Sequence, residues 1–317
     1  MRAVLIEAGK IIYGETGDPS LGDEEVLVRV ASAGINAADL LQVAGSYPPP
    51  WGVRHDIPGL EFAGVAIAQG EKVPTSFIGK RVMAIAGGAA QAELISVHHS
   101  SLIEVPPQVP LCDAGGIPEA YLTAYDALWD QGKLSIGQRV LISGATGGVG
   151  SAASSLAVVA GAMTFGTSRT EVGRKYLSSL GVHALDPLEI LGAGPFDIVL
   201  ELVGGRHFHA CLSELRSQGT IVIIGVGDQS RTDLDMRLVM MKRANVRGST
   251  LRARPQSEKA QLSRTFADRI VPHFATGTLT AKISKRYDAN DAARAYGDFA
   301  TAPKLGKLVL QFDASLQ

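Results

Sequence analysis

The sequence predicts an α/β protein in which a doubly wound parallel sheet is joined to a second, β-rich part. A glycine-rich turn at residues 144–150 lies between an apolar strand and a helix of small residues. From Asp113 to about Gly277, strands alternate with helices, which is typical of a parallel sheet with right-handed crossovers. Short runs containing β-branched residues dominate residues 1 to about 110. A length of 317 residues accommodates both parts.

The β-rich part opens the chain. Its predicted strands are Val26–Val30, Phe62–Ile67 and Arg81–Ile85, separated by Gly and Pro. A cluster of prolines at positions 106, 107 and 110 indicates a domain boundary. We therefore expect the next part of the chain to fold as a separate unit.

The alternating part follows this boundary. Its predicted helices are Glu119–Trp129, Gly148–Ala160, Glu171–Leu180 and Phe208–Arg216. Its predicted strands are Val140–Ser143, Met163–Gly166, Ile198–Leu202 and Thr220–Ile224. After these come the predicted strands Lys282–Ser284 and Lys307–Phe312 and the helix Asn290–Phe299. We expect this tail to rejoin the β-rich part, which gives one domain of residues 1–112 and 279–317 and a second of residues 113–278.

Composition and charge exclude several classes of partner. The formal net charge is −1, so no overall field attracts nucleic acid or anionic lipid. Two cysteines cannot form a disulfide framework and suit a reducing compartment. The stretch between Arg139 and Arg169 has no charge, but four glycines break it into strand, turn and helix. We expect a cytoplasmic protein with no nucleic-acid or membrane partner.

The glycine-rich turn favours dinucleotide binding. An apolar strand leads into Gly144, Ala145, Thr146, Gly147, Gly148 and Val149. Glycine lets the backbone approach a pyrophosphate, and the free N–H groups of the first helical turn point at that group. A glycine turn can be merely structural, but the order of strand, turn and helix favours a Rossmann domain with these six residues at the cofactor.

The end of the next strand favours NADPH over NADH. An NAD site has Asp or Glu about 20 residues after the glycines, bonded to the ribose 2′-hydroxyl. Here Ser168 and Arg169 occupy that place. Arg169, with Arg174 or Lys175 one turn into the helix, can form charge-assisted bonds to a 2′-phosphate. The alternative is that these are solvated charges at the start of a helix.

Five further segments carry a resemblance along nearly the whole chain. They are Asn36–Asp39, Gly45–Pro50, Ile117–Ala124, Ile270–Phe274 and Leu305–Leu310. With the glycine-rich turn, they resemble the medium-chain dehydrogenase/reductase superfamily, and within it the zinc-independent quinone oxidoreductase branch. The resemblance implies a GroES-like catalytic domain, a Rossmann domain, a cleft between the two, and a homodimer.

The resemblance also implies residues at the reaction site. Tyr47 corresponds to the tyrosine that lines the quinone site of this branch, and its alternative is a packing role ahead of the proline loop. Asn36 and Asp39 match an Asn-x-x-Asp pair beside the nicotinamide. Asn36 would bond the ribose or the substrate carbonyl, or else cap a local turn. Asp39 is catalytic or purely structural, capping the helix that follows.

Further cofactor contacts are implied for Thr123, below the nicotinamide ring, and for Gly225 and Val226, in the loop after the fifth Rossmann strand. Two positions depart from the pattern of the branch. Gly173 stands where a lysine is common, so an arginine of the same turn has to supply the cation. Gly147 stands where one member has a serine near the substrate, which puts the substrate preference in doubt.

We predict no metal. Residues 33–39 and 59–64 match the positions of the catalytic zinc ligands in related dehydrogenases, and neither segment contains Cys or His. Two cysteines cannot build a four-cysteine structural site. His207, His209 and Cys211 form the one metal-like cluster, but on a helix residue 209 points away from the other two.

These observations predict an enzyme that transfers a hydride from NADPH to a small-molecule quinone. Without a Lewis acid, the protein must depend on cofactor positioning and hydrogen bonding. Reduction of an activated C=C bond in an enone or enoyl thioester is the alternative reaction. A second alternative is a non-catalytic NADPH-binding protein, which the retention of Asn36, Asp39 and Tyr47 argues against.

Overall fold

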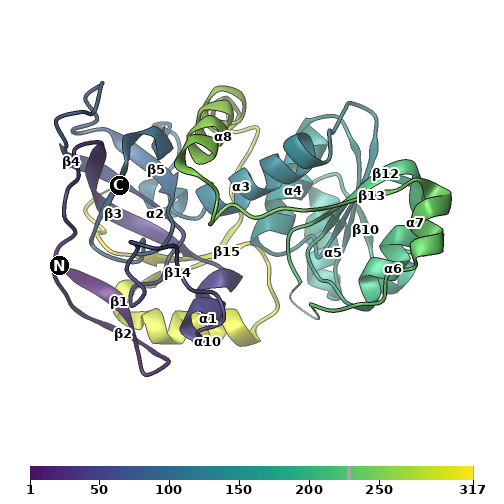
Figure 1. Cartoon of the computed structure of the whole chain (residues 1–317), viewed down its shortest axis with the longest axis horizontal. Helices are drawn as coiled ribbons and strands as arrows, with labels where there is room; N and C mark the ends of the chain where they lie inside the picture. Colours follow the sequence, from purple (N-terminus) through teal and green to yellow (C-terminus); the bar gives the residue numbers. More distant parts are fainter. Residues whose placement is uncertain (227–229, 317) are drawn as a thin grey trace. The chain divides into compact units, whose positions relative to one another are not determined.

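The computed structural model describes residues 1–226 and 230–316. The chain packs as two compact units. Unit 1 contains Met1–Leu122, Leu251–Ala302 and Lys307–Gln317. Unit 2 contains Thr123–Thr250 and Pro303–Gly306. Each unit has its own sheet (Figure 1).

Unit 2 is built on a six-stranded parallel sheet. Its strands are β8 (Arg139–Ser143), β9 (Met163–Thr167), β10 (His183–Leu185), β11 (Phe196–Glu201), β12 (Leu215–Ile223) and β13 (Asn245–Gly248). They lie in the order β10-β9-β8-β11-β12-β13, and every neighbouring pair is parallel. Numbered by sequence within the sheet, this is 3-2-1-4-5-6, the order of a Rossmann domain. The predicted fold class is confirmed for this unit.

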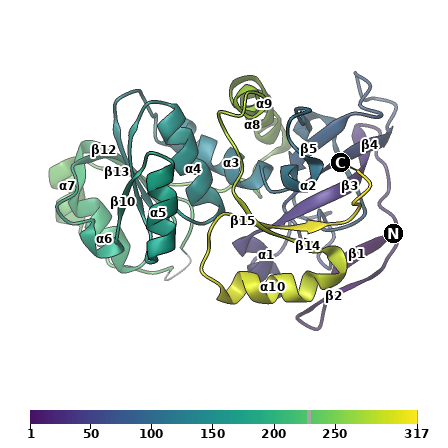
Figure 2. The ribbon, with the colours of Figure 1, turned by 180° about the vertical axis from the view of Figure 1, so that it is seen from behind.

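Helices flank this sheet (Figure 2). They are α4 (Gly148–Val159), α5 (Glu171–Ser179), α6 (Arg206–Ser213), α7 (Met236–Lys242), the π-helical turn η2 (Asp126–Gln131) and the 3₁₀ turn η3 (Pro187–Glu189). Helix α4 packs on β8 and β9, while α6 and α7 pack on β12. The central strands β8 and β11 are mostly apolar and buried, as expected where helices cover both faces of a parallel sheet.

Unit 1 is built on a seven-stranded sheet of mainly antiparallel strands. Its strands are β3 (Glu25–Ile35), β4 (Glu61–Gln69), β5 (Arg81–Ile85), β6 (Leu94–His98), β7 (Ile103–Glu104), β14 (Ile283–Asp288) and β15 (Lys307–Gln311). The order is β14-β15-β3-β4-β5-β7, with β6 also paired to β3. A separate hairpin joins β1 (Arg2–Glu7) to β2 (Lys10–Glu15). The C-terminal strand β15 therefore rejoins the β-rich part, as the sequence predicts.

Helices of unit 1 connect these strands. They are α1 (Ala37–Val43), α2 (Leu111–Ala114), α8 (Gln256–Arg269), α9 (Val271–Ala275) and α10 (Ala292–Thr301), with 3₁₀ turns η1 (His99–Ser101) and η4 (Ala289–Asp291). Helix α3 (Pro118–Tyr125) runs from unit 1 into unit 2. Among the described residues, no helix is long and apolar enough to cross a membrane.

Two segments pack with a different part of the chain from the one we expected. Residues 113–122 and 251–278 belong to unit 1, although their sequence texture resembles that of the nucleotide domain. Helix α8 explains the second case, because it packs against η1 and β7 of the β-rich part. The expected domain limits at 112/113 and 278/279 stay a prediction. Helix α7, helix α8 and strand β13 were not predicted individually.

Candidate active site

The carboxyl ends of the parallel strands bring together the expected cofactor residues of unit 2. Gly144 follows β8, Ser168 follows β9, and Gly225 follows β12 two residues after its end. We name this set, residues 144–150 with Ser168, Arg169, Gly225 and Val226, the cofactor edge. In open parallel sheets, ligands bind at the carboxyl ends of strands, where the strand order reverses.

Close packing explains the glycines of this edge. Gly144 has a φ of 79°, a left-handed conformation that glycine adopts without a steric penalty. A Cβ at Gly150 would lie 2.3 Å from the carbonyl oxygen of Gly144, so a side chain there would press on the backbone of the turn. A Cβ at Gly147 would meet nothing within 4 Å. The turn therefore has no room for a side chain at Gly150, whereas the space beside Gly147 is open.

The turn is also tied to the next strand. The N–H of Gly144 donates to Thr167 Oγ1 at 2.9 Å, and the N–H of Ala145 donates to the carbonyl of Thr167 at 3.0 Å. Helix α4 begins at Gly148, directly after this turn. The N–H groups of its first turn have no partner within the helix and point toward the cofactor edge. This arrangement is suited to holding an anionic group such as a pyrophosphate.

The end of β9 supplies a hydroxyl and a cation, with no carboxylate at the position after the strand. Ser168 is buried, and Arg169 is exposed. Arg174 is already engaged, because its guanidinium donates to the carbonyl of Ser168 at 2.9 Å and to Asp186 at 3.2 Å. A Cβ at Gly173 would lie 2.1 Å from Ser168 Oγ, so the lysine common at this position would require Ser168 to move.

The remaining expected cofactor residues lie on separate elements. Thr123 is buried in α3. The N–H of Gly225 donates to the carbonyl of Glu201 at 3.3 Å, which ties the loop after β12 to the end of β11. The carboxylate of Glu201 is buried and accepts from the N–H groups of Val203 and Gly204 at 2.7 and 2.9 Å. Sequence reasoning missed this carboxylate, which shapes the loop after β11.

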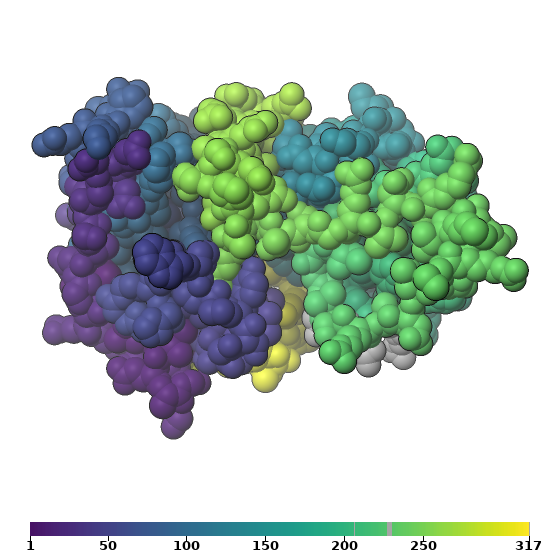
Figure 3. All heavy atoms as spheres, viewed as in Figure 1, coloured from purple at the N-terminus to yellow at the C-terminus, as the bar shows by residue number. Residues whose placement is uncertain are grey.

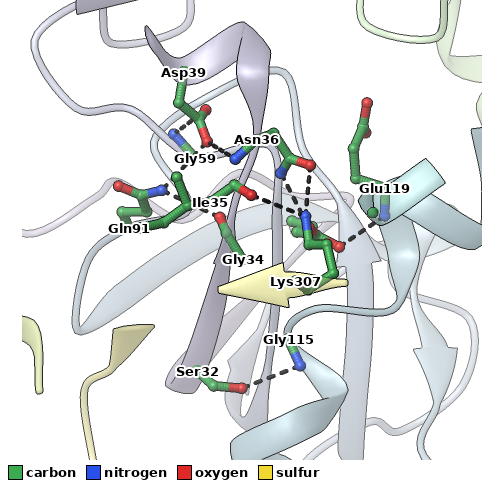
Figure 4. Close-up of polar contacts among 12 residues, drawn as sticks. Ser32, Gly34, Ile35, Asn36, Asp39, Gly59, Gln91, Gly115, Glu119 and Lys307 are labelled. Atoms are coloured by element: carbon green, nitrogen blue, oxygen red, sulfur yellow. Dashed lines mark hydrogen bonds and ion pairs between the residues drawn. The ribbon is translucent and has the colours of Figure 1, made fainter. Parts of the chain in front are cut away.

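Unit 1 carries a buried ion pair beside Asn36 (Figure 4). The ammonium of Lys307 lies 2.5 Å from Glu61 Oε1, and it also donates to Asn36 Oδ1 at 2.6 Å and to the carbonyl of Ile35 at 3.1 Å. All three ammonium protons therefore have acceptors. A Cβ at Gly34 would lie 2.2 Å from the same Glu61 oxygen, so only glycine leaves room for the carboxylate.

This ion pair fixes the side chain of Asn36. The Nδ2 group of Asn36 donates to Glu61 Oε1 at 3.0 Å, while its Oδ1 accepts from Lys307. The amide therefore has one defined orientation, since exchanging its oxygen and nitrogen would oppose both contacts. One hydrogen of Nδ2 is left over after the bond to Glu61. Asn36 thus offers one oriented N–H donor.

Asp39 lies on the first turn of α1 and is completely buried. It accepts from the N–H groups of Asn36 and Gly59 at 2.8 and 3.1 Å, and Gln91 Nε2 lies 3.4 Å away. Gln91 in turn accepts from the hydroxyl of Tyr296 at 2.7 Å. Burial raises the pKa of Asp39 to about 7, against these hydrogen bonds, which lower it. A carboxyl group enclosed in this way acts on the site only through the groups that it holds.

Glu119 lies at the start of α3, next to the ion pair. Its N–H donates to Glu61 Oε2 at 2.8 Å, while its own side chain points away from Lys307 (Figure 4). Burial, followed by the charge of Glu61, raises the pKa of Glu119 to about 8. Sequence reasoning missed this residue. We name Asn36, Asp39, Glu61, Gln91, Glu119 and Lys307 the polar network.

Tyr47 lies four residues after α1 and is half-buried. Its carbonyl accepts from Arg252 at 2.8 Å, and the guanidinium carbon of Arg252 lies 4.8 Å from the centre of its ring. Sequence reasoning missed Arg252, Glu61 and Lys307. The signal was present, because Glu61 and Lys307 are each the one charged residue of a strand whose interior is apolar, and charged residues are seldom fully buried unless they are paired.

Two family descriptions match consecutive parts of the chain. Residues 22–107 match the alcohol dehydrogenase GroES-like domain, and residues 148–268 match the zinc-binding dehydrogenase family. The quinone oxidoreductase of Lama guanicoe is 29% identical over 94% of this chain and 92% of that protein. A phenolphthiocerol/phthiocerol polyketide synthase of Mycobacterium tuberculosis is 31% identical over 90% of this chain, which spans 13% of that much longer protein.

A solved structure of a related fold is that of CurK enoyl reductase. It superposes with a TM-score of 0.84 at 25% identity, covering 98% of this chain and 99% of that one. Fold, cofactor edge and family matches together define an oxidoreductase with a nicotinamide cofactor. The chain belongs to the medium-chain dehydrogenase/reductase superfamily and is quinone oxidoreductase-like.

The residues present do not fit a zinc ion, although one family description names it. The part of the chain that the structure describes holds no group of three His, Cys, Asp or Glu side chains placed to bind a metal. Near Asn36 the available carboxylate, Glu61, is paired with Lys307. In helix α6, Cys211 is buried against Glu201 while His209 is exposed. We derive no step through a metal, and its absence stays a prediction.

Proposed function

We propose that this protein is an NADPH-dependent reductase that transfers a hydride to a quinone without a metal. The observation that carries the proposal is the end of β9, where Ser168 and Arg169 replace the carboxylate of an NAD site. The 29% identity with a quinone oxidoreductase over most of both chains supports the choice of acceptor. The cofactor, when bound, supplies a hydride from its nicotinamide ring.

Arg169 is the cation proposed for the 2′-phosphate. Arg174 is held by Asp186 and by the carbonyl of Ser168, and Lys175 is paired with Glu171 at 2.6 Å. Arg169 is exposed, and the described residues show no ion pair to it. An arginine can form two parallel hydrogen bonds with a phosphate, so it serves this purpose without help from the helix.

Residues of unit 1 are proposed to act on the acceptor. Asn36 would donate its remaining Nδ2 hydrogen to the ribose or to the acceptor carbonyl, in the orientation set by Glu61 and Lys307. Asp39 would hold the backbone of Asn36 in place. Tyr47 would orient the acceptor and donate a proton, a role that solvent can share. The quinone then takes up one hydride and one proton and leaves as the hydroquinone.

Reduction of an activated C=C bond is the second candidate. The superposition with CurK enoyl reductase and the identity with a polyketide synthase favour it. The same set of residues would then orient an enoyl thioester or enone, which receives the hydride at its β-carbon and a proton at its α-carbon. The two reactions are distinguished by the acceptor alone.

We also propose that the protein is a homodimer. Strand β13 is the edge of its sheet, and all four of its residues are exposed. In the neighbouring helix α7, Met236, Met240 and Met241 are 77%, 69% and 68% exposed. The segment from 230 to 250, green in Figure 3, covers much of the visible face of unit 2. Unpaired edge strands beside apolar side chains favour pairing with another chain. Sedimentation velocity should give a dimer, and a single monomer species would contradict this.

A cytoplasmic location is proposed from the cysteines. Cys112 and Cys211 are both free, and Cys211 is buried. Burial and the nearby carboxylate of Glu201 raise the pKa of the Cys211 thiol well above its usual value, so the group is inert as a nucleophile. Free thiols of this kind suit a reducing compartment.

A matrix of two cofactors and two acceptors tests the function. NADPH and NADH are each followed by absorbance with 1,2-naphthoquinone and with crotonyl-CoA. The proposal expects rapid turnover of the quinone with a clear preference for NADPH. Turnover of the thioester alone would move the assignment to enoyl reduction. If neither acceptor is reduced, the remaining interpretation is a cofactor-binding protein without this activity.

A further inference from the structure

The guanidinium of Arg252 is almost fully enclosed in unit 1, with 6% of the residue exposed. Each of its three nitrogen atoms donates to a different residue. Nε donates to the carbonyl of Gly87 at 2.9 Å, one terminal nitrogen donates to the carbonyl of Tyr47 at 2.8 Å, and the other donates to Gln42 Oε1 at 2.5 Å. One side chain therefore joins the segment 42–47 and Gly87, which lie more than 160 positions from Arg252 in the sequence.

Tyr47 makes two contacts with this guanidinium, one through its backbone carbonyl and one through its ring. Its carbonyl accepts a hydrogen bond, and its ring faces the guanidinium at 4.8 Å from the ring centre. The first contact fixes the backbone at residue 47, and the second fixes the direction of the ring by a cation–π contact. A planar guanidinium can make both contacts at once, whereas the ammonium of a lysine is a single point of charge.

Gln42 extends the arrangement to the other end of the same loop. Its Oε1 accepts from Arg252, and its Nε2 donates to the carbonyls of His55 and Ile57 at 3.1 and 3.3 Å. The loop from Tyr47 to Ile57 contains three consecutive prolines and Trp51, which is fully exposed. This loop is thus bound at both ends by one connected pair, Arg252 and Gln42.

The backbone around Arg252 is itself held in place. Lys259, in the first turn of α8, donates to the carbonyl of Arg252 at 2.8 Å. A Cβ at Gly88 would lie 2.9 Å from Val53 of the same loop and 3.5 Å from the guanidinium, so glycine allows the close approach. Burial lowers the pKa of Arg252, because the charged guanidinium loses its contact with water. Its hydrogen-bond acceptors therefore have to compensate for the cost of burying the charge.

We propose that Arg252, together with Gln42, is a positioning residue that fixes the loop of Tyr47 and thereby the orientation of the acceptor. The inference rests on the proposed role of Tyr47 in the reduction. Arg252 does not touch the reacting atoms in this scheme. It acts by removing the freedom of the loop before the acceptor binds.

The first test measures the loop without any reaction. The chain has two tryptophans, so Trp129→Phe leaves Trp51 in the loop as the one fluorescent tryptophan. In this background, Arg252→Lys should increase the fast component of the Trp51 anisotropy decay. Arg254→Lys is the matched control, two residues away, and should keep the parent decay. An unchanged decay in the folded Arg252→Lys protein would overturn the proposal.

The second test is kinetic. Arg252→Lys should raise the KM for 1,2-naphthoquinone about tenfold and leave the KM for NADPH unchanged. Tyr47→Phe should have its full effect in the parent and little effect in the Arg252→Lys background, because the ring is no longer held. Independent, additive effects of the two substitutions would contradict the inference.

Two controls keep the outcomes separate. If Arg252→Lys does not fold, as judged by circular dichroism, the same measurements on Gln42→Met test the proposal. This substitution removes the acceptor of Arg252 and the hydrogen bonds to His55 and Ile57, and it keeps the side-chain volume. If the wild type reduces no quinone, the proposed function fails, and the anisotropy of Trp51 still decides on the loop. If it reduces quinone and neither variant changes decay or KM, the inference alone fails.

Discussion

The cofactor edge of unit 2 and the polar network of unit 1 are built in opposite ways. The edge consists largely of backbone: a tight glycine turn, a helix start, and two loops at the ends of neighbouring strands. The network consists of side chains from β4, α1 and its N-cap, α3, β15 and the loop that contains Gln91, and Asn36 and Lys307 within it are 271 positions apart. A site built from backbone keeps its shape only while there is room around its glycines. A network of side chains keeps its shape only while each buried charged or polar group has its partner.

The difference predicts which changes each region tolerates. The stability of the glycine turn in the edge should be lowered by added atoms, because some of its glycines make close contacts. The network should be damaged by lost partners, because a buried charge without its counter-charge is costly. Four substitutions test this contrast, beginning with the largest expected effect.

Lys307→Met should lower the free energy of unfolding by about 3–5 kcal/mol. The substitution keeps the aliphatic stem but leaves the carboxylate of Glu61 buried without its cation. Denaturant unfolding followed by circular dichroism measures the change. Lys285→Met removes an exposed lysine paired with Asp298 and should unfold close to the wild type. Equal stability of the two variants would refute the view that the network depends on pairing.

The edge could be predicted from sequence because its parts are contiguous. The strand, the turn and the helix start of residues 140–160 stand next to one another, and Ser168 and Arg169 follow at the expected distance. The parallel, doubly wound sheet was predicted from the alternation of strands and helices, but its strand order and its edge strands β10 and β13 were not. Helix α8 was missed because its polar sequence shows no clear apolar face, and its position depends on packing against β7.

The network could be predicted only in part. Asn36 and Asp39 were identified through the resemblance to the quinone oxidoreductase branch, which did not show that Asp39 is enclosed. The partners Glu61, Lys307 and Arg252 come from distant positions, and no spacing rule connects them. A single charged residue in an apolar strand indicates a buried partner without identifying it. Tertiary contacts of this kind need the fold.

Arg169→Ser should reduce the preference for NADPH over NADH by about tenfold to a hundredfold, the loss expected for a charge-assisted hydrogen bond. The ratio of kcat/KM for the two cofactors measures it. Arg174→Gln should change the ratio less, because that guanidinium is engaged by Asp186 and Ser168. If Arg174→Gln changed the ratio more than Arg169→Ser, the cation that binds the 2′-phosphate would be Arg174 and not Arg169.

Gly150→Ala should destabilise the protein by about 1–3 kcal/mol, because its Cβ would press on the carbonyl oxygen of Gly144. Gly147→Ala, where a Cβ meets nothing within 4 Å, should keep the stability of the wild type without cofactor. Thermal unfolding of both variants provides the comparison. The same loss in both would show that close packing does not distinguish the two glycines.

Glu119→Gln should flatten the pH dependence of stability. The pKa of this carboxyl is raised from 4.5 to about 8 in the folded protein, so the folded state holds a proton that the unfolded state has released. Stability of the wild type therefore falls as the pH rises through this window and is constant above it. Relative to the variant, we expect stability to fall by up to about 1.4 kcal/mol for each pH unit within this window. Denaturant midpoints of the wild type and of Glu119→Gln, measured across this pH window, test the prediction. If the two curves run parallel, the pKa of Glu119 is not raised in the folded protein.

Hydride transfer from NADPH to a quinone can be followed in a single-turnover experiment with deuterated cofactor. Enzyme and NADPH, carrying deuterium on one or the other face of C4, are mixed rapidly with 1,2-naphthoquinone. Hydride transfer from one face of the nicotinamide should give one rapid oxidation per site, slowed by deuterium on that face only. Loss of NADPH that is equally fast with deuterium on either face, or that occurs with crotonyl-CoA and not with the quinone, would contradict it.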